Sequence, residues 1–351
     1  MTIGLDIGSS AVRAVQFAKS RHGVRRLTHH GEVPLPAGAV VDGDVLEPVV
    51  VTTALRELWG QTRLRERAVA VGLASQRVTV RQIDLPELPD PELRDAVRLQ
   101  AQDQLPIPVD QAVLDHVVVD RYAVGDDRRN VRLLLVAADR DMVERLLFPV
   151  TEAKLRPVVV DLDAFALVRS LGATSVEDDV ELIVDIGATV TKITVHRQGT
   201  PLFVRMVRLG GDGATRQLQK VLELEWDDAE AAKLAASTAM TAGAHLDPDD
   251  ERARVLHGEV QRILGEIRRS LEFFRAQHPD VTVRRALLSG GTSLAPSLPE
   301  QLEAVLELSV VAAAPLQAIN PVDGGQGGPP LVPHGGRFLA VAVGLALGSP
   351  T

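Results

Sequence analysis

The chain has 351 residues, of which 45% are apolar and 24% are charged, so its composition excludes a disordered protein and allows two large domains. Its net charge of −9 argues against nucleic acid as a main partner, because phosphate backbones attract basic surfaces. Cysteine is absent from the sequence, which excludes disulfides, thiolate zinc sites and cysteine nucleophiles.

The N-terminal residues lack the features of a secretory signal peptide. No basic segment comes first, and an acidic residue already stands at Asp6. No run of the sequence approaches the roughly 20 apolar residues that a membrane span needs, and the apolar run 338–347 is expected to be a buried helix. We therefore expect a cytoplasmic protein without direct membrane insertion.

In chain order, the first half of the sequence predicts strands mixed with helices. The strongest helix start is Asp90-Pro91-Glu92, where Asp90 is expected to be the N-cap and Pro91 the first helical residue. Strands are predicted over 24–33, 68–73, 78–83, 112–121, 131–138 and 158–162, and helices over 48–64, 90–105, 141–155 and 164–171.

The second half repeats this mixture and ends in a helix. An apolar stripe on the predicted helix 253–277 is expected to pack against a sheet, and a Gly/Pro-rich loop is expected over 323–336. Strands are predicted over 181–186, 190–196, 201–207, 285–288 and 309–313, and further helices after Gly210-Gly211, within 227–250, and over 297–306 and 338–347.

One sequence pattern occurs twice, half a chain apart. Residues 3–15 read IGLDIGSSAVRAV and residues 182–194 read LIVDIGATVTKIT, and both predict a strand, a tight turn and a second strand. Because the repeat unit is about half of the chain, the pattern indicates a duplicated domain and not a solenoid.

Each copy of the pattern brings together the residue types that a magnesium–nucleotide complex needs. Glycine lets backbone N–H groups approach phosphate oxygens because it lacks a Cβ atom and tolerates positive φ, and carboxylates suit Mg²⁺. A single Asp-x-Gly is more often an ordinary turn, but its repetition favours two turns that clamp phosphates from both sides. The predicted Mg²⁺ ligands, acting through water, are Asp6 and Asp185, and the predicted phosphate cradle is Gly8, Ser9, Ser10, Gly187 and Thr189.

Further signals are weaker when taken singly. Arg13 and Lys192 follow the two turns and could reach a phosphate or remain at the edge of the core. Three other pairs or groups have an ordinary structural reading as a turn, a helix start or an exposed i,i+3 pair. We nevertheless assign all three groups to the predicted site. They are Gly290, Gly291 and Thr292 beside the nucleoside, Gly210 and Gly211 before a helix, and Glu230 with Lys233.

The order of these motifs resembles the actin-like superfamily that also contains sugar kinases. The resemblance implies an α/β, ribonuclease H-like duplicated fold, with two halves around a cleft for ATP and Mg²⁺. Within the superfamily the chain looks like the PilM family of type IV pilus assembly proteins. That likeness is carried most specifically by 78–108 (VTVRQIDLPELPDPELRDAVRLQAQDQLPIP), and also by 133–139, 155–166, 205–211 and 228–234.

This resemblance implies four subdomains and a set of partners. Subdomain IA would hold 1–77, 156–180 and 337–351, the FtsA-type IC would hold 78–155, IIA would hold 181–226 and 282–336, and IIB would hold 227–281. A groove between IA and IC would take the N-terminal cytoplasmic peptide of a PilN-like inner-membrane protein, which would place the chain at the inner face of the membrane. The resemblance also leaves room for contact with the pilus assembly ATPase.

Turnover of ATP would need a residue that orients water, and Asp163 stands where the superfamily keeps such a group, although the same residue could simply cap its helix. We expect slow or no hydrolysis. The alternatives are a polymerising division protein like FtsA, against which the lack of a C-terminal amphipathic helix argues, and a sugar-kinase-like phosphotransferase.

Overall fold

A computed structural model of the chain describes residues 2–19, 25–125, 128–172, 179–241, 250–316 and 333–348. Most of the predicted Gly/Pro-rich loop over 323–336 lies outside these residues. None of the helices in the described ranges is both long enough and apolar enough to cross a membrane.

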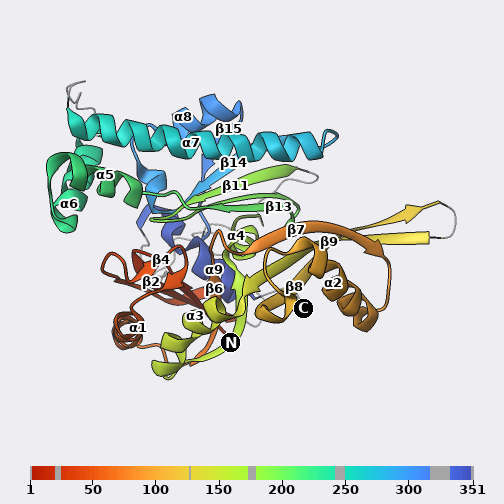
Figure 1. Ribbon diagram of the computed structural model, residues 1–351. Helices are drawn as coiled ribbons and strands as arrows, with labels where there is room; N and C mark the ends of the chain where they lie inside the picture. The colour runs from red at the N-terminus through yellow and green to blue at the C-terminus, as the bar shows by residue number, and fades with distance from the viewer. Residues whose placement is uncertain are drawn as a thin grey trace.

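Two five-stranded sheets with the same topology form the body of the protein (Figure 1). In each sheet the first three strands form an antiparallel meander, and two later strands add in parallel at the other side. The first sheet has the order β10-β6-β1-β2-β3, with β1 (Ile3–Ile7), β2 (Ala11–Lys19), β3 (Arg25–Pro34), β6 (Ala68–Leu73) and β10 (Arg156–Leu162). The second has the order β13-β12-β11-β14-β15, with β11 (Val180–Ile186), β12 (Thr191–Arg197), β13 (Thr200–Val207), β14 (Val283–Ser289) and β15 (Ser309–Ala312).

The repeated sequence pattern occupies the same register in both sheets. Asp6 pairs with Arg13 across β1 and β2, and Asp185 pairs with Lys192 across β11 and β12. The glycine N–H of each turn donates to a carbonyl three residues later, from Gly8 to Ala11 and from Gly187 to Val190, both at 3.0 Å. The predicted duplication is therefore confirmed down to single backbone hydrogen bonds.

Helices cover the sheets and fill the space between them (Figure 1). Apolar residues of α1 (Pro48–Thr62) and α3 (Arg140–Glu152) pack on the first sheet, and those of α7 (Glu251–Gln277) and α8 (Leu298–Leu306) pack on the second. The predicted apolar stripe of α7 is buried: Leu256, Val260, Ile263, Ile267, Leu271 and Phe274 are each at most 9% exposed. The helices α5 (Asp212–Leu222) and α6 (Trp226–Thr241) follow the second meander.

The two halves share a core built by α4 (Asp163–Leu171) and α9 (Ala340–Leu347). Residues of both helices pack together with Ile183 of the second sheet and Ala70 of the first. The helices cross closely, because a Cβ atom on Gly344 would lie 1.8 Å from the carbonyl oxygen of Ala166. α9 also lies tightly on β1, where a Cβ atom on Gly4 would lie 2.0 Å from the Ala342 oxygen.

A third, smaller sheet has its own core. Its order is β7-β9-β8, and α2 packs on it through Leu93 and Val97. The elements are β7 (Thr79–Pro86), α2 (Asp90–Gln104), β8 (Ala112–Val124) and β9 (Arg128–Asp139), and the β8–β9 hairpin projects from the body (Figure 1). Short elements are β4 (Val40–Val41), β5 (Asp44–Val45) and the 3₁₀ turns η1 (Val109–Gln111), η3 (Gly291–Leu294) and η4 (Pro333–Leu339). The division into four subdomains stays a prediction.

The expected cap of α2 is wrong by one residue. Pro89, with φ −55° and ψ 149°, occupies the N-cap position, so Asp90 is the first helical residue and Pro91 the second. The backbone of Pro89 is extended, which suits the flanking position and leaves the acidic residues Asp90 and Glu92 in the first turn, where the helix dipole favours them.

The helix crossing predicts a steric effect on stability. Gly344→Ala should lower the free energy of unfolding by about 1–3 kcal/mol, because the added methyl group must displace backbone at Ala166. Urea unfolding followed by circular dichroism measures this change. Gly60→Ala in α1 is the matched control, since nothing lies within 4 Å of the new Cβ atom; there we expect a gain of about 0.5–1 kcal/mol. Equal stability of the Gly344→Ala variant and the wild type would contradict the tight crossing.

Candidate functional site

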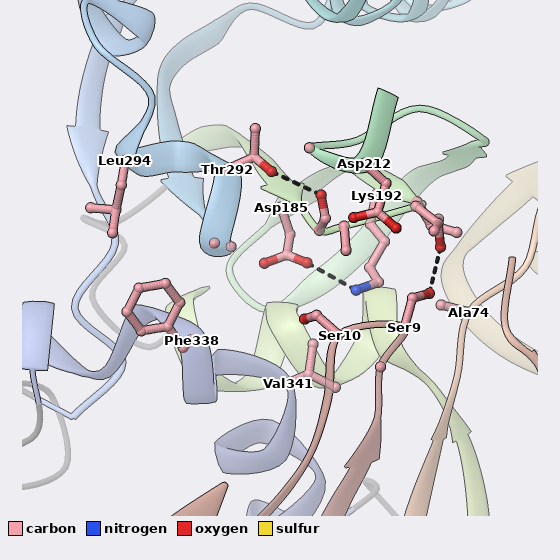
Figure 2. A pocket seen from close by; sticks show the side chains of 18 of the residues that line it. Ser9, Ser10, Ala74, Asp185, Lys192, Asp212, Thr292, Leu294, Phe338 and Val341 are labelled. Carbon is pink, nitrogen blue, oxygen red and sulfur yellow. Dashed lines mark hydrogen bonds and ion pairs between the residues drawn. The ribbon is translucent and has the colours of Figure 1, made fainter. Parts of the chain in front are cut away.

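A cavity of about 480 Å³ lies between the two halves of the molecule (Figure 2). Its walls come from the first aspartate turn (Asp6–Ser10), the second aspartate turn (Asp185–Thr189), the starts of α4 and α5, and one face each of α6 and α7. All of the residues predicted for the site line this cavity except Gly210: Asp6, Gly8, Ser9, Ser10, Arg13, Asp163, Asp185, Gly187, Thr189, Gly211, Glu230, Lys233, Gly290, Gly291 and Thr292.

The two aspartate turns touch each other across the cavity. The hydroxyl groups of Ser9 and Thr189 form a hydrogen bond of 2.5 Å between residues 180 positions apart (Figure 2). Ser10, beside Ser9, is exposed to the cavity. The repeated motifs therefore face a common space from opposite halves.

The glycines of these turns do not use the positive φ that glycine tolerates. Neither Gly8 nor Gly187 has a positive φ. Their lack of a side chain serves close packing, since a Cβ atom on Gly187 would lie 2.9 Å from the Val190 oxygen. Positive φ occurs instead at Gly290, with φ +88°, where a Cβ atom would also lie 2.4 Å from the Ile186 oxygen.

A cluster of opposite charges is buried at the bottom of the cavity. The ammonium group of Lys192 lies 2.9 Å from Asp185 Oδ2 (Figure 2) and 3.2 Å from Asp163 Oδ2. Burial alone would lower the pKa of Lys192, but the carboxylates of Asp185, Asp163 and Asp6 outweigh it and raise the pKa. Burial raises the pKa of Asp6, and the charges of Arg13 and Lys192 oppose that rise. The sequence left the place of Lys192 open; the structure puts it at the centre.

Asp163 joins this cluster from the first half and does not cap its helix. Leu162 holds the N-cap position, and Asp163 is the first residue of α4 without a capping hydrogen bond. Its Oδ1 is buried and has no hydrogen-bond partner among the described residues. Gly72 makes room for it, because a Cβ atom there would lie 2.3 Å from Oδ1. Burial, followed by the negative charge of Asp6, raises the pKa of Asp163 to about 7 against the attraction of Lys192.

Arg13 has a different environment from Lys192, although the two occupy equivalent positions. Its Nε donates to Glu32 Oε2 at 2.5 Å, and its Nη1 lies 3.8 Å from Asp6 Oδ2. Glu32, on β3, thus draws Arg13 toward the rim of the cavity.

The wall formed by the second half is connected by hydrogen bonds. Lys233 lies 2.6 Å from Glu230 Oε2 and donates to the Thr215 hydroxyl at 3.0 Å. Thr292 donates to the carbonyl of Gly187 at 3.0 Å (Figure 2), which ties η3 to the second aspartate turn.

Gly210 lies behind the wall and packs against the second aspartate turn. A Cβ atom there would lie 2.5 Å from the carbonyl oxygens of both Gly187 and Ala188. Its predicted contact with phosphate has no support in the cavity lining, and its absent side chain serves packing.

Several residues of the cavity did not appear in the sequence prediction. Asp212, at the start of α5, has a pKa raised by burial and opposed by Lys233 and Arg216. Phe338 precedes α9, and Glu259 lies on α7. The signal that could have found Glu259 is its place in an i, i+3, i+4, i+7 series on α7, in which it is the single polar member.

The residues present fit a magnesium ion that keeps most of its water. Among the described residues, no group of three or more His, Cys, Asp or Glu side chains is arranged to enclose a metal. Mg²⁺ characteristically retains several waters and uses one or two carboxylates together with substrate phosphates. Asp6 and Asp185 offer such carboxylates at the turns, and the unpartnered Asp163 Oδ1 offers a third acceptor.

Comparison with known proteins decides the family. A family model described as type IV pilus assembly protein PilM matches residues 4–349. The chain belongs to the PilM family. A chain in the solved structure of a PilM–PilN type IV pilus biogenesis complex is 28% identical, with a TM-score of 0.84 over 99% of this chain and 97% of that chain.

More distant structures share the fold alone. They include the ethanolamine utilization protein EutJ from Carboxydothermus hydrogenoformans (16% identity, TM-score 0.56, 99% and 89% of the two chains). MreB 5 of Spiroplasma citri, solved bound to AMPPNP, is 12% identical with a TM-score of 0.55 over 99% and 95%. The predicted actin-like fold is therefore confirmed.

Curated relatives in sequence are cell division proteins FtsA. The protein of Agrobacterium fabrum is 27% identical over 248 residues, and the match covers 65% of this chain and 53% of the relative. The chain thus spans about half the length of that relative. The protein of Pseudomonas aeruginosa is 26% identical, with 90% of this chain and 83% of the relative covered.

The raised pKa of Asp163 predicts a pH dependence of stability. Between pH 3.8 and about 7 the folded protein holds a proton that the unfolded chain releases, so this contribution to stability is lost as the pH rises through that window. Asp163→Asn, a neutral mimic of the protonated acid, should flatten this slope and raise the free energy of unfolding at pH 8 by on the order of 1 kcal/mol.

Urea unfolding at half-unit steps from pH 4.5 to pH 8 measures the effect. Asp95→Asn is the control, because Asp95 is an exposed carboxylate on α2 and lies far from the cluster in the chain's fold. An unchanged slope in Asp163→Asn would show that this carboxyl group does not take up the proton.

Proposed function

We propose that the chain is an ATP-binding, actin-like scaffold of the inner-membrane complex that assembles type IV pili. The observation that supports it most is the cavity between the two aspartate turns, which places Asp6 and Asp185 on opposite walls of one space. Family membership supplies the pilus context, and the AMPPNP-bound MreB neighbour is a protein of this fold with an ATP analogue.

In this proposal, Asp6 and Asp185 hold hydrated Mg²⁺, and the N–H groups and hydroxyls of the two turns hold the phosphates. The metal supplies positive charge that offsets the triphosphate. Lys192 already neutralises part of the buried negative charge, with Asp185 at 2.9 Å and Asp163 at 3.2 Å. Gly290, Gly291 and Thr292, together with Glu230 and Lys233, line the part of the cavity that we assign to the nucleoside.

Nucleotide binding would act by setting the relative position of the halves. A ligand shifts an open–closed equilibrium only by its difference in affinity for the two states. Because the site draws residues from both halves, including the Ser9–Thr189 contact, a nucleotide that touches both turns favours the closed arrangement. We expect slow hydrolysis or none, with Asp163 as the residue that would orient water.

We also propose that a PilN-like N-terminal peptide docks along β10, in the predicted groove between subdomains IA and IC. β10 is the edge strand of the first sheet, so one side of its backbone pairs with no other described strand. Its residues Val158, Val159 and Val160 are 41%, 37% and 36% exposed. An exposed apolar edge is a template for an extended peptide, and a PilM–PilN complex is among the similar structures.

Replacement of the second aspartate tests the nucleotide site. Asp185→Ala should weaken Mg-ATP binding at least about 100-fold, because the carboxylate that faces the metal is lost. Isothermal titration calorimetry with and without Mg²⁺ measures the affinity. Asp44→Ala is the control, since Asp44 is also ion-paired, with Arg77 and Arg145, but lies outside the cavity. Wild-type affinity in a folded Asp185→Ala protein would refute the site.

A charge placed on the exposed edge strand tests the docking surface. Val159→Glu should weaken binding of a synthetic N-terminal PilN peptide roughly tenfold or more, because the apolar contact is replaced by a carboxylate. Fluorescence anisotropy of the labelled peptide measures this. Val311→Glu is the matched control, because Val311 is 41% exposed on β15, the corresponding edge strand of the second sheet. If both variants bind equally well, the peptide docks elsewhere.

A further inference from the structure

One face of α7 forms part of the cavity wall. Leu256, Glu259, Val260 and Ile263 all line the cavity, and their spacing puts them on the same side of the helix. Three of these four side chains are apolar. Glu259 is therefore the single carboxylate on this apolar face, where burial of an ionisable group costs free energy.

The Glu259 side chain is buried with one oxygen satisfied and the other free. Glu259 is 5% exposed, and its Oε2 accepts from Arg262 Nη1 at 2.7 Å. Its Oε1 is buried and finds no hydrogen-bond donor within the described part of the chain. A buried acceptor without a partner costs free energy, so a group that supplied a donor here would gain more than an ordinary hydrogen bond.

The neighbouring chain is shaped to admit this oxygen. A Cβ atom on Gly213, in the first turn of α5, would lie 1.8 Å from Glu259 Oε1. Any other residue at position 213 would push the carboxylate away. The position of Glu259 Oε1 thus depends on the absence of a side chain at Gly213 in α5.

The location of Glu259 indicates which part of a nucleotide it meets. The phosphate-binding groups proposed above lie at the two aspartate turns. Part of the apolar lining comes from α6, α7 and η3, through Leu234, the α7 face and Leu294. Figure 2 shows Leu294 on the side of the cavity opposite Ser9 and Lys192. A flat, apolar base fits the apolar side.

We propose that Glu259 selects the base, by accepting a hydrogen bond from the exocyclic 6-amino group of adenine. This inference rests on the proposed nucleotide site. Because Arg262 occupies Oε2, Oε1 remains as the free acceptor, and the 6-amino group of adenine supplies an N–H donor for it. Guanine carries a carbonyl oxygen at that position, and its lone pairs would meet the carboxylate without a proton between them. The site therefore prefers ATP to GTP.

The test compares three nucleotides as magnesium complexes: ATP, GTP and purine riboside triphosphate, which lacks the 6-amino group. Calorimetry gives Kd for each with the wild type, Glu259→Leu and Glu259→Gln. For the wild type we expect ATP to bind roughly 10- to 100-fold more tightly than purine riboside triphosphate. Glu259→Leu should bring that ratio to within about twofold, and Glu259→Gln, which keeps the shape and a neutral acceptor, should give an intermediate ratio.

Arg262→Gln is the matched control, because it removes the partner of Glu259 and keeps the carboxylate, so the ratio should stay high. A wild-type ratio near one, or a ratio that Glu259→Leu leaves unchanged, would overturn the inference while the nucleotide site stands. An equal loss of affinity for all three nucleotides in Glu259→Leu would assign Glu259 to the shared ribose and also overturn it. Absence of binding for every nucleotide to the wild type would overturn the proposed function together with the inference.

Discussion

The buried ammonium group of Lys192 links carboxylates from the two halves of the molecule. It lies among carboxylates from both of them, with Asp185 on the neighbouring strand of its own sheet and Asp163 at the start of α4. Burying charges is costly unless they are paired with good geometry, and removing one partner leaves the other uncompensated. Lys192 therefore offsets part of the negative charge in the cleft, and a metal bound there would offset more of it.

Much of this could be predicted from the sequence, because the repeat carries its own geometry. An aspartate and a basic residue seven positions later become direct partners on an antiparallel strand pair, at 6 and 13 and again at 185 and 192. The repeat could not predict that the two basic residues, Arg13 and Lys192, have different ion-pair partners. Arg13 is drawn to Glu32 on β3, whereas Lys192 is buried against Asp163. Those neighbours come from distant segments, and local pattern carries no information about them.

The remaining differences between prediction and structure concern single residues whose roles depend on their neighbours in the fold. Asp90 was expected to cap its helix, yet it is the first helical residue, because the extended Pro89 takes the cap position. Capping was the alternative for Asp163, and there Leu162 takes the cap position. Gly210 does not line the cavity and packs on the Gly187 and Ala188 carbonyls, so its predicted contact with an anion stays a prediction. Glu259 was missed because a single acid in an apolar stripe looks like an exposed residue until the cavity behind the stripe is known.

The first half also joins its proposed docking strand to the cleft through continuous structure. β10 ends at Leu162 and α4 begins at Asp163, so the exposed valines lie within five residues of a carboxylate that contacts Lys192. Arg169 of α4 pairs with Asp161 of β10 and donates to the Gly344 carbonyl of α9 at 3.0 Å. β10, α4 and α9 are thereby connected, and α4 and α9 pack backbone to backbone at Gly344. A peptide on the edge and a nucleotide in the cleft would therefore contact two ends of the same connected unit, which is the physical route by which each would influence the other.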